Sequence, residues 1–168
     1  QLGFPLEAMC RAIRRFKGLP HRSEKLAEIE GVMWINDSKG TNVGATLAAI
    51  AGIGSTLKGR LILLAGGVGK GADFTPLGDP MARFGREAVV FGMDAPQLDA
   101  ALRDHVPVHH VTDLEAAMIR ARAIAEPGDC VLLSPACASL DQFSDYVARG
   151  EAFRQGVQRF AEEAGRGD

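Results

Sequence analysis

Apolar positions along the chain follow two patterns, and together they predict a layered fold. Short segments that are almost entirely apolar have the length and composition of buried strands. The segments between them carry apolar side chains at helical spacing. Strands are expected at residues 25–30, 32–35, 61–65, 88–91, 106–111 and 130–133, the first two as a hairpin or as two linked strands. Helices are expected at residues 41–53, 76–84, 95–102, 113–125 and from about residue 141 onward.

Buried strands that alternate with amphipathic helices indicate a doubly wound α/β fold, with a mostly parallel sheet and helices on both faces. One more helix is expected before Gly18, where Leu6, Met9, Ile13 and Phe16 recur at helical spacing. We therefore expect residues 1–18 to be a helix or linker from a preceding domain and residues 19–168 to be the domain itself. The chain has no initiator Met, so we expect a piece of a longer protein.

Composition narrows the class of protein. The 168 residues are 46% hydrophobic and 24% charged, the balance of a globular domain. A net charge of −2 argues against a nucleic-acid partner, and no segment approaches the ~20 apolar residues that span a bilayer. Cys10, Cys130 and Cys137 show no CxxC spacing and predict free thiols in a reducing compartment. We expect a cytoplasmic protein that binds neither nucleic acid nor membrane.

Ligands of doubly wound folds bind outside the carboxyl ends of the strands, so the loops there are the candidates for chemistry. In the loop at residues 36–42, Asp37 is suited to a ribose diol and Lys39 to a phosphate or carboxylate. Thr41 is suited to cap the following helix or to help hold an anion. A plain polar turn with a helix cap explains these residues about as well.

The glycine-rich loop at residues 66–73 allows several interpretations. It fails the P-loop motif at two required positions. Gly67, Gly69 and Ala72 fit a loose dinucleotide fingerprint, but no acidic residue ends the next strand as that fingerprint requires. A third hypothesis is a flexible loop that delivers Lys70 to an anionic substrate. A surface turn with a solvated lysine remains open.

The loop at residues 134–143 begins with small residues that let a ligand approach the backbone. Ser139 and the amide groups after it are expected to open the last helix and to cradle a carboxylate. Cys137 has no histidine in an obvious partnering loop, which favours a buried, inert thiol over a nucleophile.

Histidines suggest no metal centre. His109 and His110 are adjacent on an expected strand, so their side chains point to opposite faces and cannot easily share a metal ion. His105 has no companion, and only His21, beside Arg22, looks placed for a site. The sequence shows no catalytic triad or carboxylate dyad.

Four sequence blocks occur in an order that resembles one family. They are Gly-Leu-Pro-His-Arg at 18–22, Trp-Ile-Asn-Asp-Ser-Lys-Gly-Thr-Asn at 34–42, Gly-Gly-Val-Gly-Lys-Gly-Ala-Asp-Phe at 66–74 and Leu-Ser-Pro-Ala-Cys-Ala-Ser-Leu-Asp-Gln-Phe at 133–143. From about residue 19 onward the chain resembles the C-terminal domain of the Mur ligases. The second and fourth blocks resemble the members that add D-glutamate in peptidoglycan synthesis, since sister ligases and folylpolyglutamate synthases commonly have His or Asn after the corresponding Asp.

The resemblance implies ATP-dependent amide formation. A carboxylate of UDP-N-acetylmuramoyl-L-alanine would be phosphorylated, and the amine of D-glutamate would then attack the acyl phosphate. The positions that match the family's site residues are Arg22 and Asp37 for the nucleotide, Lys39 for catalysis near the phosphate, and Thr41, Lys70, Ser139 and the backbone of Tyr146 for D-glutamate. The family often has Phe at the last position, a change that a backbone contact tolerates.

The same resemblance implies what other parts of the protein supply. The P-loop and the Mg²⁺ ligands would lie in a central domain, and the UDP-binding residues in an N-terminal domain. We expect a monomer in which this domain closes over the central one, and a chain that is inactive alone. The alternative is a stand-alone nucleotide- or dinucleotide-binding α/β module without ligase activity, which would use the glycine loop.

Overall fold

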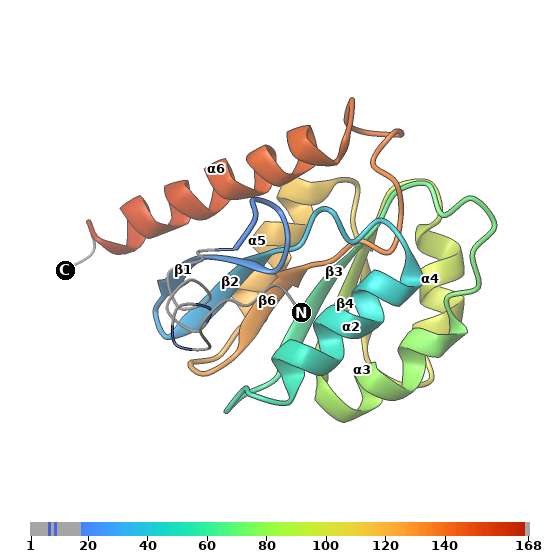
Figure 1. Ribbon diagram of the computed structural model, residues 1–168, viewed down its shortest axis with the longest axis horizontal. Coiled ribbons are helices and arrows are strands. Elements are labelled where there is room, and N and C mark those ends of the chain that lie inside the picture. The colour runs from blue at the N-terminus through green and yellow to red at the C-terminus, as the bar shows by residue number, and fades with distance from the viewer. Residues whose placement is uncertain (1–6, 8, 10–17, 167–168) are drawn as a thin grey trace.

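The computed structural model describes Glu7, Met9 and residues 18–166, and its core is a six-stranded sheet in the order β1-β2-β6-β3-β4-β5 (Figure 1). The strands are β1 Glu24–Ile29, β2 Val32–Asn36, β3 Leu61–Gly66, β4 Gly85–Phe91, β5 Val108–His110 and β6 Cys130–Leu133. The helices are α2 Val43–Gly54, the 3₁₀ helix η1 Thr75–Leu77, α3 Gly78–Phe84, α4 Ala95–Leu102, α5 Leu114–Ile124 and α6 Tyr146–Ala164. Strand β1 is antiparallel to β2, and the other neighbouring strands of this sheet are parallel, which confirms the predicted fold class.

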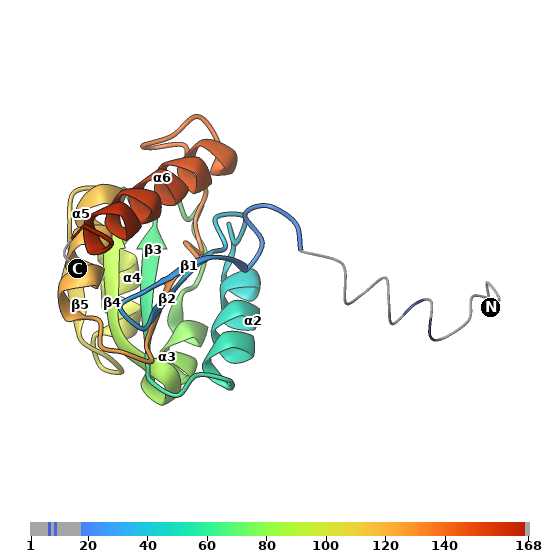
Figure 2. The ribbon, with the colours of Figure 1, turned by 90° about the vertical axis from the view of Figure 1, so that its left-hand side faces the viewer.

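Successive residues of the central strands point to opposite faces of the sheet, and each face builds its own core. Leu61 and Leu63 pack with α2, α3 and α4 on one face. Ile62 and Leu64 pack with α5 and α6 on the other, as Figure 2 shows from the side. Strands β3 and β6 are buried along their whole length. Burial on both faces explains why their sequences are continuously apolar instead of alternating.

The last helix begins later than the sequence pattern predicts. Helix α6 starts at Tyr146 and not near Asp141, with Asp145 as its capping residue. Residues 139–145 form turns, and the Asp141 carboxylate accepts a hydrogen bond from the amide of Met93 in another loop. The prediction was wrong by five residues because contacts with a distant loop hold this segment out of the helix.

The helix predicted before Gly18 lies outside the described residues, apart from Glu7 and Met9, and so does the Cys10 thiol. The division of the chain at residue 18 therefore stays a prediction. Within the described part of the chain, no helix combines the length and apolar character that crossing a membrane requires.

Candidate functional site

The loops that follow β2, β3 and β6 meet at the carboxyl edge of the sheet, toward the upper right of Figure 1, and backbone hydrogen bonds join them. The amide of Ala136, after β6, donates to the carbonyl of Gly40, after β2, at 2.9 Å. Val68, after β3, and Ala138 exchange two such bonds at 2.8 and 2.9 Å. The loop after β6 therefore lies between the other two and fixes their relative positions.

Three of the residues singled out from the sequence share one pocket. Arg22, Asp37 and Lys39 line a hollow of about 260 Å³ whose wall is a row of small side chains on α2. The remaining lining residues are Ser23, Gly40, Ala45, Ala48 and Ala49. Arg22 is exposed and Lys39 is half-buried, so both cations are within reach of a ligand in this pocket. The pocket thus combines two positive charges and one carboxylate beside an open, alanine-lined wall.

Asp37 is the most buried of these three side chains, with 7% of its surface exposed. Its Oδ1 accepts from the amide of Ser23 at 2.9 Å, and its Oδ2 accepts from the hydroxyl of Ser134 at 2.7 Å. Burial raises the pKa of Asp37, and the hydrogen bonds with the charge of Arg22 offset that rise only in part. Each carboxylate oxygen can accept more than one hydrogen bond, so Asp37 keeps the capacity to bind hydroxyl groups in the pocket.

A strained turn holds Arg22. Its neighbours His21 and Ser23 have left-handed backbones, with φ of 62° and 41°. The His21 side chain is buried, and its Nδ1 accepts from the side-chain Nδ2 of Asn36 at 3.1 Å. A Cβ on Gly150 of α6 would lie 2.2 Å from that nitrogen, so only glycine admits this packing. His21, which looked placed for a site, therefore supports the turn that carries Arg22 and does not line the pocket.

Lys39 points toward Tyr146. Its Nζ lies 3.2 Å from the tyrosine hydroxyl and 4.7 Å from the centre of the ring. The carbonyl of Tyr146 already accepts from the Ser38 hydroxyl at 2.8 Å. A ligand carboxylate needs a donor, so a backbone contact with Tyr146 would use its amide N–H. This amide is in the first turn of α6, where amide groups have no partner within the helix.

Thr41 and Ser139 do not have the local roles that the sequence suggested. The cap of α2 is Asn42, whose side chain accepts from Ala45, so the prediction that Thr41 caps this helix was wrong. Ser139 does not open a helix either, because α6 begins at Tyr146. Ser139 lies instead in a turn, and its side chain is buried with 3% exposed. The expected cradle of helical amide groups after Ser139 is thus absent from the described loop.

Lys70 lies at the tip of the glycine loop and is exposed. Its backbone is left-handed, with φ of 55°, and Gly71 follows with φ of 74°. The loop does not lead directly into a helix, since η1 begins at Thr75 and α3 at Gly78. A dinucleotide fingerprint needs the helix to start at the loop and its last small residue to pack there. Ala72 is exposed, so the structure does not support the dinucleotide alternative.

Arg149 of α6 is the residue of this edge that sequence reasoning missed. It is fully buried, and its guanidinium donates to the carbonyls of Ser38, Gly66 and Cys137 at 2.9, 3.4 and 3.1 Å. A fourth bond reaches the Ser38 hydroxyl at 3.1 Å. Burial lowers the pKa of Arg149 to about 10, which leaves it protonated at neutral pH. One side chain thus ties the end of β3 to the loops after β2 and β6.

The thiols and the exposed histidines add no chemistry to this edge. Burial raises the pKa of Cys130 and of Cys137 to about 12, so both are unreactive free thiols. The inert thiol was predicted for Cys137. His109 and His110 are exposed, and His110 lies 3.4 Å from Asp99. Among the described residues, no group of three or more His, Cys, Asp or Glu side chains is placed to hold a metal ion.

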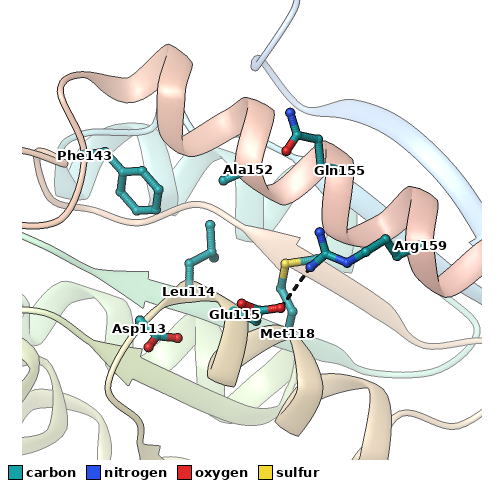
Figure 3. A pocket seen from close by; sticks show the side chains of 8 residues that line it. All are labelled: Asp113, Leu114, Glu115, Met118, Phe143, Ala152, Gln155 and Arg159. Carbon is teal, nitrogen blue, oxygen red and sulfur yellow. Dashed lines mark hydrogen bonds and ion pairs between the residues drawn. The ribbon is translucent and has the colours of Figure 1, made fainter.

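A second hollow of about 280 Å³ lies between α5 and α6, and Phe143 from the loop after β6 also lines it (Figure 3). Leu114, Met118 and Phe143 point into it, and an exposed ion pair of 3.0 Å between Glu115 and Arg159 spans one end. None of the residues singled out from the sequence lines it. The candidate site therefore remains the carboxyl edge of the sheet.

Comparison with known proteins extends this picture. The family model described as "Mur ligase, glutamate ligase domain" matches residues 21–137. The UDP-N-acetylmuramoylalanine–D-glutamate ligase of Chromohalobacter salexigens is 68% identical over 163 residues, which cover 97% of this chain and 36% of that protein. The ligase of the same name from Nitrosococcus oceani is 55% identical over 157 residues, which cover 94% of this chain and 34% of that protein. The chain thus spans about a third of the length of these relatives.

Solved structures share the fold at much lower identity. The MurF ligase of Thermotoga maritima in complex with ADP has a TM-score of 0.62 at 16% identity and covers 93% of this chain and 36% of that one. A bifunctional folylpolyglutamate synthase/dihydrofolate synthase of Yersinia pestis has a TM-score of 0.65 at 17% identity, covering 92% and 35%. These likenesses support the architecture alone.

Proposed function

The chain belongs to the Mur ligase family, matching its glutamate ligase domain, and from this we propose that it is the C-terminal domain of an ATP-dependent ligase that joins D-glutamate to UDP-N-acetylmuramoyl-L-alanine in peptidoglycan synthesis. The relatives at 55–68% identity, named for D-glutamate ligation, support this choice of substrate. In this proposal the domain acts in the cytoplasm, in a monomer, and together with the central and N-terminal domains of the same protein.

One observation carries the proposal: cationic side chains stand at two places on one edge of the sheet. Arg22 and Lys39 line the pocket with Asp37. Lys70 lies on the loop after β3, which the Val68–Ala138 pair joins to the loop after β6. A ligase that couples a nucleotide to a dicarboxylic amino acid needs positive charge for the phosphates and for both substrate carboxylates.

The pocket at Asp37 has the features of a nucleotide contact. Its carboxylate can accept hydrogen bonds from a ribose diol, and Arg22 adds a charge for the phosphates or a stacking surface for the base. Lys39 would place its ammonium against the phosphoryl group as charge develops there, which stabilises the transition state. The Tyr146 ring and hydroxyl limit the directions that Lys39 can take, so the ammonium is already partly positioned.

D-glutamate would bind beside this pocket, with Lys70 as its main charged contact. Thr41 and Ser139 would add hydroxyl groups, and Tyr146 would add its amide N–H. The substrate amine would then lie near the phosphorylated carboxylate next to Lys39. Closure of this domain over the central one would exclude the water that hydrolyses an acyl phosphate.

ATP and Mg²⁺ are part of the proposal, and Mg²⁺ would neutralise phosphate charge when bound. The described residues do not provide a metal site, so we assign its ligands to the central domain and derive no step through the ion here. The role of this chain is to bind the nucleotide from one side and to hold the amino acid.

The test uses the full-length enzyme and three lysine variants. Lys39→Ala is expected to lower kcat by about 10²–10³-fold, the range seen when a group that stabilises transition-state charge is removed. Lys70→Ala is expected to raise the KM for D-glutamate with little change in the KM for ATP. Lys58→Ala, an exposed lysine in the segment before β3, is the control and should change neither value.

Two outcomes would contradict the proposal. One is that Lys39→Ala and Lys70→Ala leave the kinetics as they are. The other is micromolar binding of NAD by this chain alone, which would favour the stand-alone module instead.

A further inference from the structure

Asp94 stands at the start of a helix but does not cap it. Four described helices have Asn or Asp at the N-cap position, namely Asn42, Asp94, Asp113 and Asp145. Three of these side chains accept a hydrogen bond from the amide three residues later, which is the usual use of such a residue. Asp94 makes no such bond to α4. The Asp94 carboxylate therefore leaves α4 without a side-chain cap.

The carboxylate of Asp94 is bonded to the glycine loop. Its Oδ2 accepts from the amide of Gly69, and the Asp94 amide donates to the carbonyl of Gly67 at 3.0 Å. A Cβ on Gly69 would lie 3.1 Å from this carboxylate and 2.6 Å from the Phe74 ring, so the loop is packed closely against both. Lys70 is the next residue. The carboxylate thus holds the backbone immediately before the lysine.

A second carboxylate extends this connection to the loop of Ser139. Asp141 accepts from the amide of Met93, next to Asp94, at 2.9 Å. Its Oδ2 would be 2.4 Å from a Cβ on Gly92, which places it directly over the loop after β4. Asp141 therefore links the loop after β6 to the loop after β4. Asp94 in turn links the loop after β4 to the glycine loop.

We propose that Asp94 is a positioning residue for D-glutamate, acting through Lys70. This inference rests on the function proposed above. Lys70 is exposed on a loop that includes three consecutive residues with unusual freedom or strain, Gly69 to Gly71. A loop without such a hydrogen bond would lose conformational entropy each time substrate binds, and that loss would weaken binding. The hydrogen bond from Gly69 to Asp94 orders the loop before substrate binds and so reduces this entropy loss. The carboxylate is bonded to the backbone, so it fixes the loop while the lysine side chain stays free for substrate.

The test is steady-state kinetics of the full-length enzyme with Asp94→Ala, Asp94→Asn and Asp113→Ala. Asp94→Ala is expected to raise the KM for D-glutamate about five- to twentyfold, as expected for losing one hydrogen bond to a charged group, with kcat and the KM for ATP nearly unchanged. Asp94→Asn keeps an oxygen acceptor for Gly69 and should restore the KM to within about twofold. Asp113→Ala is the matched control, because it removes an aspartate that does cap its helix. It should lower thermal stability without changing the KM for D-glutamate.

A double variant separates this inference from the function on which it rests. If Asp94 acts through Lys70, Asp94→Ala should add no further rise in KM to Lys70→Ala. Full additivity of the two effects, or an equal KM rise for Asp94→Ala and Asp113→Ala, would overturn the positioning role. If Lys70→Ala itself leaves the KM for D-glutamate unchanged, the proposed function fails and the role of Asp94 with it.

Discussion

Replacing Arg149 by Met is expected to destabilise the domain strongly, although it removes a buried charge. The guanidinium is fully buried and makes four hydrogen bonds, all to uncharged oxygens. Buried ion pairs can sometimes be exchanged for apolar residues without loss when both partners are replaced together. Here the partners are the carbonyls of Ser38, Gly66 and Cys137, which no side-chain substitution removes.

The magnitude follows from those acceptors. A buried acceptor left without a donor costs about 1–3 kcal/mol of stability. Each of the three carbonyls would lose its donor, although the three costs do not simply add. Part of the sum is recovered because a charged group no longer has to be desolvated. We expect Arg149→Met to lower the free energy of unfolding by about 4 kcal/mol, a large part of the ~5–15 kcal/mol typical of a domain.

Urea denaturation at neutral pH measures this loss. Arg149→Lys should fall between wild type and Arg149→Met, because an ammonium is compact and cannot reach all three carbonyls as a planar guanidinium does. Arg159→Met, on the exposed side of the same helix, is the control, and its surface ion pair with Glu115 predicts a change within about 1 kcal/mol. Equal stability of Arg149→Met and wild type would refute the reasoning that these loop carbonyls need a donor.

Two further predictions concern buried carboxylates and pH. Burial raises the pKa of Asp37, so its favourable contribution to stability is complete below the unfolded pKa of about 4 and is lost as pH rises through the folded pKa. In urea, Asp37→Asn should therefore be at least as stable as wild type at pH 7 and should lose any gain in stability near pH 4. The same variant should raise the KM for ATP. Burial alone would raise the pKa of Asp129, but hydrogen bonds from Arg86 and from the amides of Arg60 and Glu126 outweigh burial and lower that pKa. The contribution of Asp129 to stability is therefore present above about pH 4 and is lost as pH falls through the folded pKa. Asp129→Ala should cost about 3 kcal/mol at pH 7 in the same assay and less at acid pH, and a cost independent of pH would contradict this account.

Apolar patterning determined most of the secondary structure. Because β3 and β6 are buried on both faces, their sequences are continuously apolar, and their short length favours strands over buried helices. The helices between them follow from the spacing of their apolar residues. The ordered polar blocks also predicted a candidate site at one edge of the sheet, since loops after parallel strands meet at one edge. The pocket formed by Arg22, Asp37 and Lys39 agrees with that expectation.

Local patterns failed where distant loops decide the conformation. Ser139 reads as a helix start, yet the contact between Asp141 and Met93 holds the segment in turns as far as Asp145. Asp94 occupies the N-cap position of α4, but its carboxylate accepts a hydrogen bond from the amide of Gly69 on another loop. In both cases a hydrogen bond between residues far apart in sequence outweighs a local preference worth about 1 kcal/mol.

The sequence by itself thus determined the layers of the fold, because the order of apolar residues follows the burial and the spacing of the strands and helices. It also predicted which loops form the candidate site. Only the tertiary structure decided how those loops are held. Arg149 looks like any arginine on an amphipathic helix, and its role comes from three carbonyls that reach it from separate parts of the chain. Backbone oxygens leave no trace in the sequence, so a side chain that exists to satisfy them is recognised only once the chain has folded around it.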